Sequence, residues 1–150
     1  MSMVGVEGLI VSEWVLAALV ADGAIGAALG LTAGQTVASR VWEGVAPEGT
    51  PFPYVVFTVA EPQDVATVPA TRVMVRAGLQ VKAIGKGPSY RPLVPLVQRI
   101  DAALQGARNK ATSQGGMVLS CERLSAIQYP EQDQGIEYRH LGGSYQVHAQ

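Results

Sequence analysis

The sequence predicts an α+β domain, with an antiparallel sheet of about four to five strands and two main helices packed on one face. Residues 72–84 alternate between apolar and polar side chains, which is the period of a half-buried strand. Residues 93–104 carry apolar side chains at intervals of four, three and four, the period of an amphipathic helix. A first helix is predicted at 10–21, and residues 1–150 have the usual length of a single domain.

The N-terminal third is predicted to be helical and rich in glycine. Ser12 is available as a helix cap, and apolar side chains follow at helical spacing until Gly23 ends the helix. Residues 24–31 predict a further short turn of helix. Residues 15–33 are apolar enough to resemble a membrane span, but Asp22 and several glycines interrupt them, so a pair of buried or amphipathic helices is favoured.

A proline-rich approach to a strand follows a short strand at 40–43. Three prolines in V-A-P-E-G-T-P-F-P-Y-V-V fix φ and exclude a helix, and residues 54–60 are β-branched or aromatic, as a buried strand requires. We expect Tyr54, Val56 and either Val55 or Phe57 to lie in the core.

Residues 61–71 are predicted to form a long connection, because they contain two prolines and exceed the two to five residues of common hairpin loops. Val65 and Val68 are apolar where solvent is expected. This segment is either an arm that lies on a neighbouring molecule or a surface loop. The candidate interface residues are Glu61, Asp64, Val65, Val68, Arg72, Arg76 and Lys82.

Arg72, Arg76 and Lys82 share the polar face of the strand 72–84. This basic stripe is compatible with phosphate contacts, but no stacking aromatic accompanies it. Pairing with carboxylates of a neighbour, or simple solvation, is favoured.

The last half of the chain predicts a second helix and two closing strands. Ser89 can cap the helix, and Pro95 predicts a kink or a late regular start. Residues 105–116 are polar, and strands are predicted at 117–127 and 134–147, connected across 129–133. A change of phase near Gly142 suggests a bulge.

Composition excludes several classes of protein. The net charge of −1 leaves no electrostatic footprint for nucleic acid. The absence of Lys and Arg before Arg40 argues against a signal peptide. Charged residues make up only 15% of the chain, which favours a surface partly covered by partners. Cys121, the single cysteine, fits a reducing cytoplasm and is expected to be a small hydrophobic residue in a strand.

No catalytic or metal-binding pattern is found. The turn at 85–89 lacks the spacing of a phosphate loop, and His140, His148 and Cys121 form no ligand motif. The acidic residues Glu131, Asp133 and Glu137 are typical of a solvated turn. We therefore expect no cofactor, no metal and no enzymatic activity.

The motif Ala46-Pro47 with Gly49 and Pro53-Tyr54-Val55-Val56, together with the helix at 93–104, resembles the siphophage tail-terminator or tail-completion family. Relatives of that family occur in phages, prophages and phage-like gene transfer agents. The resemblance covers most of the chain, from about position 12 to position 147.

This resemblance implies a structural ring, usually of six subunits, on the head-proximal end of the tail tube. Its implied partners are further copies of itself, the tail tube protein and the neck or head-completion protein, with DNA passing through the lumen and no membrane. The implied location is the tail–neck junction of a virion assembled in the host cytoplasm. Two alternatives remain: another neck or head-closure component, and a small ligand-binding or enzymatic domain that uses the turn at 85–89.

Overall fold

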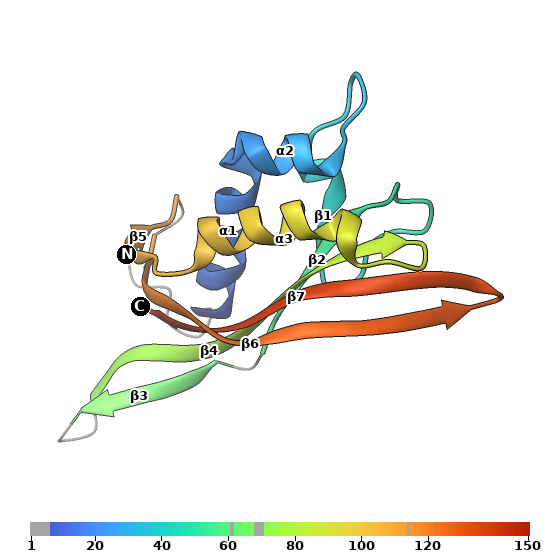
Figure 1. Cartoon of the computed structure of the whole chain (residues 1–150). Coiled ribbons are helices and arrows are strands. Elements are labelled where there is room, and N and C mark those ends of the chain that lie inside the picture. The colour runs from blue at the N-terminus through green and yellow to red at the C-terminus, as the bar shows by residue number, and fades with distance from the viewer. Residues whose placement is uncertain (1–6, 61, 68–70, 114) are drawn as a thin grey trace.

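The structure, a computed structural model, describes residues 7–60, 62–67, 71–113 and 115–150. Within them, α-helices pack on one face of a long, twisted, mostly antiparallel sheet (Figure 1), which confirms the predicted α+β class. The helices are α1 (Glu7–Ala21), α2 (Gly23–Leu29) and α3 (Val94–Leu104). The strands are β1 (Val41–Glu43), β2 (Tyr54–Val59), β3 (Gln63–Thr67), β4 (Thr71–Lys86), β5 (Arg108–Ala111), β6 (Met117–Asp133) and β7 (Ile136–Ala149).

The sheet is organised around three long strands, β4, β7 and β6. Its order is β1-β2-β4-β7-β6-β5, and β3 lies beside the N-terminal half of β4 while β2 lies beside the C-terminal half. β1 runs parallel to β2, and the other pairs are antiparallel.

Three segments predicted as connections contain strands instead. β3 lies within 61–71 and β5 within 105–116, both too short and too polar to show a clear alternation. Residues 129–133 continue β6, because Gln134 and Gly135 alone make the turn to β7, with φ of 51° and 79°. Two positive φ values are the requirement of a tight hairpin, but Gln-Gly is a weaker sequence signal for it than Asn-Gly.

The first helix begins earlier than predicted, so Ser12 is not its cap. Ser12 lies buried inside α1, where its hydroxyl donates a 2.7 Å hydrogen bond to Glu43 Oε1 and ties the helix to β1. Asp22 caps α2 by accepting from Ala24 N at 2.9 Å. No single helix in the described chain is long and apolar enough to span a bilayer; α1 and α2 meet those criteria only together, bent by 75°.

The second predicted helix starts late, as its prolines require. A 3₁₀ turn at Arg91–Leu93 precedes α3, and Ser89 Oγ accepts a 3.1 Å hydrogen bond from Arg91 N. Tyr145 on β7 donates a 2.8 Å hydrogen bond to Asp101 Oδ1, which fixes α3 against the sheet. The side chains of α3 and its preceding turn that face the sheet are Leu93, Leu96, Ile100 and Leu104.

Alternate residues of β4 from Val75 to Ala83 are buried beneath the helices, as the alternation predicted. Val55 and Phe57 join them in the core. Tyr54 is only half-buried, so its predicted place in the core is wrong. Residues 54 and 56 point to the face without helices, called here the open face, since successive side chains of a strand alternate.

The outer edge of β6 is largely open. β5 pairs with it only from Met117 to Ser120, and no other described strand lies beside the rest. The pairing of β6 with β7 shifts register between Arg123 and Ser125, so the irregularity predicted at Gly142 lies on the neighbouring strand. Gly142 has its own constraint: a Cβ there would lie 1.9 Å from Val81 O, so β4 and β7 approach too closely for any side chain.

Replacing Phe57 by Ala is expected to lower the free energy of unfolding by about 3–5 kcal/mol, because the ring is 2% exposed and its loss leaves a cavity. Urea unfolding measures the change, with the exposed Thr58→Ala as the control. Equal stability of the two variants would show that this ring does not fill the core.

Burial raises the pKa of the Cys121 thiol to about 12 from its ordinary value of 9.0, with smaller contributions from Glu122 and Asp101. Because only the unfolded thiol ionises readily, its contribution to stability is complete below pH 9 and is lost as the pH rises towards 12. The free energy of unfolding should fall by up to about 1.4 kcal/mol per pH unit above pH 9 from this group. Cys121→Ala should show a shallower decline between pH 9 and 10; identical slopes would contradict the assignment.

Candidate functional site

The first candidate surface is a two-stranded projection, called here the arm, formed by β3 and residues 71–76 of β4. β7 reaches along β4 only as far as Val75, so residues 71–74 pair with β3 alone among the described strands. Figure 1 shows this hairpin extending beyond the rest of the sheet. An isolated two-stranded ribbon is at best marginally stable in water. The arm is therefore held by pairing between its own two strands, without a third strand beside its outer residues.

The arm carries most of the interface residues predicted from the sequence. Asp64 is exposed and lies opposite Val75, while Val65 is half-buried and lies opposite Met74. Arg76 is exposed and donates a 3.1 Å hydrogen bond to Gln63 Oε1 across the two strands. The backbone of Arg72 pairs with that of Ala66. Glu61 and Val68 lie outside the described residues, as does the side chain of Arg72.

Lys82 belongs to a different cluster, on the open face. Its Nζ donates a 2.7 Å hydrogen bond to Tyr129 Oη. The Tyr129 ring stacks on His140 with centroids 4.3 Å apart, and His140 Nε2 lies 2.6 Å from Glu131 Oε2. Lys82 is six residues along β4 from Arg76, about 20 Å. Arg76 and Lys82 therefore share one face of β4, but they contact different partners.

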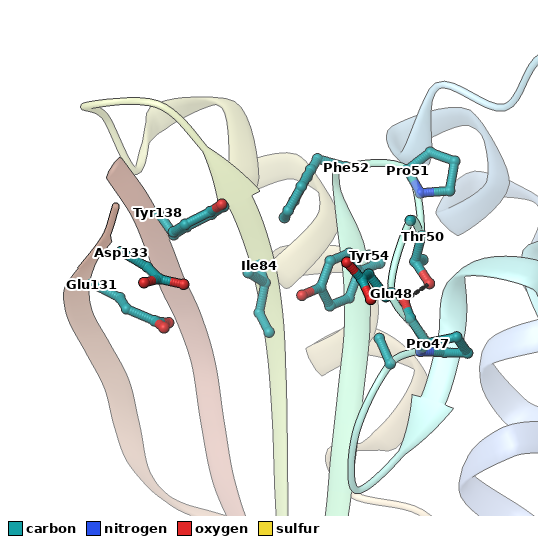
Figure 2. Close-up of a pocket in the computed structure, with 12 residues that line it drawn as sticks. Pro47, Glu48, Thr50, Pro51, Phe52, Tyr54, Ile84, Glu131, Asp133 and Tyr138 are labelled. Atoms are coloured by element: carbon teal, nitrogen blue, oxygen red, sulfur yellow. Dashed lines mark hydrogen bonds between the residues drawn. The ribbon is translucent and has the colours of Figure 1, made fainter. Parts of the chain in front are cut away.

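A pocket of about 540 Å³ lies at the end of the open face nearest the β6–β7 turn (Figure 2). The loop at 46–52 forms one wall and the tip of the β6–β7 hairpin forms the other. Tyr54 and Ile84 lie between them, on β2 and β4. The lining residues are Ala46, Pro47, Glu48, Gly49, Thr50, Pro51, Phe52, Tyr54, Ile84, Glu131, Asp133 and Tyr138.

Buried Arg40 holds the end of this loop in place. Its Nη1 donates hydrogen bonds of 3.1 Å to Leu29 O and to Pro53 O, and its Nη2 donates one of 2.7 Å to Gln35 Oε1. Leu29 is the last residue of α2, whose C-terminal carbonyls carry partial negative charge. Sequence reasoning placed Arg40 only at the start of a strand and missed this role, because carbonyl partners leave no motif.

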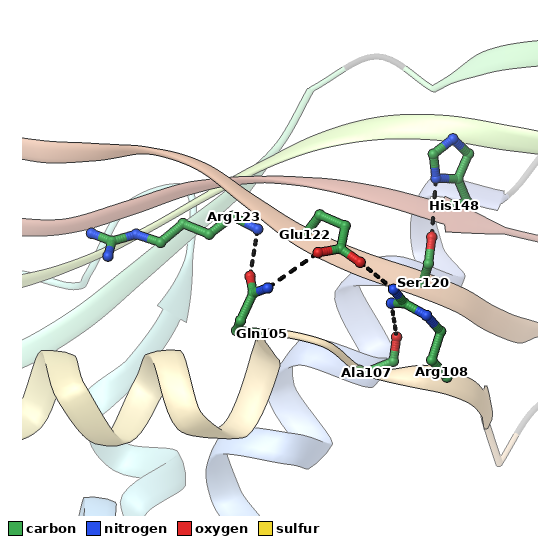
Figure 3. Close-up of polar contacts among 7 residues, drawn as sticks. All are labelled: Gln105, Ala107, Arg108, Ser120, Glu122, Arg123 and His148. Carbon is green, nitrogen blue, oxygen red and sulfur yellow. Dashed lines mark hydrogen bonds and ion pairs between the residues drawn. The ribbon is translucent and has the colours of Figure 1, made fainter.

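Polar contacts hold the short strand β5 at the opposite end of the sheet (Figure 3). Gln105 Nε2 donates to Glu122 Oε2 at 3.1 Å, and Gln105 Oε1 accepts from Arg123 N at 2.5 Å. Arg108 hydrogen bonds to Glu122, which lowers the pKa of that carboxyl. Lys110, two residues further on, is exposed and has no hydrogen bond or ion pair within the described chain.

Two of the groups considered for catalysis, the turn at 85–89 and Cys121, make structural contacts. Gly87 N donates a 2.9 Å hydrogen bond to Glu137 O, and Ser89 Oγ accepts from Arg91 N, so the turn at 85–89 is occupied by structural contacts. Cys121 is completely buried in the core, as predicted. In residues 7–60, 62–67, 71–113 and 115–150, no three His, Cys, Asp or Glu side chains are placed to hold a metal ion.

Comparison with known proteins gives a structural likeness alone. No family model and no curated protein matches the chain. Among solved structures, a chain of the virion of a native gene transfer agent particle superposes with a TM-score of 0.62 and 17% sequence identity, covering 89% of this chain and 91% of that one. At this identity, the likeness shows a shared fold.

Replacing Arg40 by Met is expected to lower the free energy of unfolding by about 2–4 kcal/mol, because it leaves buried carbonyls without donors. The loop at 46–52 should also become more accessible to protease. Arg91→Met, at an exposed arginine, is the control. Unchanged stability and cleavage in Arg40→Met would show that the guanidinium does not hold the loop.

Proposed function

We propose that this chain is a structural protein of a phage-like virion, of the kind represented by gene transfer agents, and that residues 1–150 act as a single tail-terminator-like domain. Six copies form a ring on the head-proximal end of the tail tube, at the tail–neck junction. The ring stops growth of the tube and offers a joining surface to the neck or head-completion protein. DNA passes through its lumen without sequence-specific binding.

Two likenesses support this proposal. The sequence resemblance rests on the proline-rich motif at 46–56, which the structure places at the entry to β2 and along one wall of the pocket. The structural likeness is to a chain described as part of a gene transfer agent virion, and it extends over 89% of the present chain. Both point to an assembled particle.

The observation that carries the proposal is the arm. Its outer residues pair with each other and with no further described strand, so the free subunit gains little from ordering them. A neighbouring molecule that covers Val65 and Met74 would supply the missing burial. A ring subunit needs such a contact, because head-to-tail surfaces close into a ring when the rotation between subunits permits.

The arm is tested by replacing residues 64–68 with a Gly-Ser linker of equal length. The variant should keep its far-ultraviolet circular dichroism and lose ring formation, since β3 no longer pairs across to β4. Electron microscopy of the purified protein and of assembled tails measures both. Replacing the exposed residues 32–34, in the loop beyond α2, with Gly-Ser-Gly is the matched control, because it keeps the length of the chain and Gln35.

Normal rings and normally terminated tails from the linker variant would contradict a role for the arm. Tail length in particles that lack the chain separates the terminator from its closest alternative. Overgrown tails support termination, whereas tails of normal length that fail to join heads indicate another neck or head-closure component.

A further inference from the structure

The pocket on the open face combines aromatic walls with carboxylates. The centroid of the Phe52 ring lies 5.1 Å from that of the Tyr54 ring and 5.5 Å from that of the Tyr138 ring. Figure 2 shows Asp133 and Glu131 on one side of these rings and Glu48 on the other. No Lys or Arg is among the residues that line the pocket.

Two of the three carboxylates are uncompensated. Glu131 is engaged with His140, but Glu48 and Asp133 make no hydrogen bond or ion pair with any described residue. Desolvation is the main cause that raises the pKa of the Tyr54 phenol, and the charge of Glu131 adds to it. The pocket walls therefore bring carboxylates together with the negative faces of aromatic rings.

Such surroundings favour a cationic side chain. Aromatic faces attract Lys and Arg side chains within about 6 Å, and a carboxylate in reach adds a charge-assisted hydrogen bond. An anionic or purely apolar group would gain from the rings alone and would meet the carboxylates unfavourably. The expected occupant is a Lys or Arg side chain of a protein partner.

The same chain offers such a side chain at the other end of its sheet. Lys110 on β5 lies opposite Val118, whereas Glu131 and Asp133 lie at the far end of the same strand, β6. From position 118 to position 131 is thirteen residues, about 40 Å along a strand. Lys110 therefore cannot reach the pocket of its own subunit. Its neighbour Arg108 is already paired with Glu122.

We propose that the pocket of one copy receives Lys110 of a second copy, so that acidic and basic ends of adjacent subunits join head to tail. This contact rests on the proposed ring and is one of the contacts, called here a joint, between its adjacent subunits. A joint of this kind is heterologous, and it repeats from subunit to subunit. It is separate from the arm, so each can be altered without the other.

The experiment uses two charge reversals in the full chain, Lys110→Glu and Asp133→Lys. Each should weaken self-association by about tenfold or more, measured by sedimentation equilibrium. An equimolar mixture of the two variants should recover assembly, since each supplies the surface that the other lacks and the altered residues are complementary in charge. Arg91→Glu, an equal change at an exposed arginine, should associate as the wild type does.

A second measurement detects the joint directly. The variant with Lys110→Cys and Asp133→Cys should form a ladder of disulfide-linked multimers, while Arg91→Cys with Asp133→Cys should not. Wild-type association by both reversals, failure of the mixture to recover assembly, or absence of the ladder would overturn the contact. Rings that persist on tails despite these results would leave the proposed function standing, whereas a wild-type protein that forms no ring on tails would contradict that function itself.

Discussion

The buried guanidinium of Arg40 joins three segments that would otherwise be independent. It binds the last carbonyl of α2, the side chain of Gln35 and the backbone that leads into β2. No carboxylate pairs with it in the described chain, so its charge is balanced by carbonyl dipoles and the C-terminal end of a helix. This arrangement fixes where the proline-rich loop stands, and through it one wall of the pocket. The position of one pocket wall on the open face therefore depends on Arg40, a buried residue outside the pocket.

The two faces of the sheet differ in what covers them. The helix-covered face holds the core, with alternate residues of β4 beneath α1 and α3. The open face has no helices, yet Val56, Ile84 and His140 are each at most 6% exposed there. The Tyr129 ring stacks on His140, and Ile84 lines the pocket together with the loop at 46–52. The two ends of β6 also differ in charge. The basic strand β5 pairs with its first residues, and acidic side chains lie among its last residues.

Sequence patterns located the elements whose apolar side chains recur at a fixed period. They failed for strands that are held mainly by backbone pairing with a neighbouring strand. The alternation at 72–84 and the stripe at 93–104 identified β4 and α3, because burial imposes those periods. β3 was missed, because its five residues are held by β4 rather than by a core of their own. Of the candidate interface residues, Asp64, Val65 and Arg76 lie together on the arm, while Lys82 is bound to Tyr129. The pocket could not be predicted, since its two walls come from segments that lie far apart in the sequence, the loop at 46–52 and the hairpin at 131–138.

The open outer edge of β6 has a consequence for how the protein is kept in solution. An exposed strand edge invites pairing with any other edge, and soluble proteins blunt it with charges and proline. Along this edge the chain places Arg123, Pro130 and Glu131, and Gln105 already occupies Arg123 N. Pairing of this edge with a strand of another molecule is thereby discouraged, so the open edge need not lead to association through the backbone.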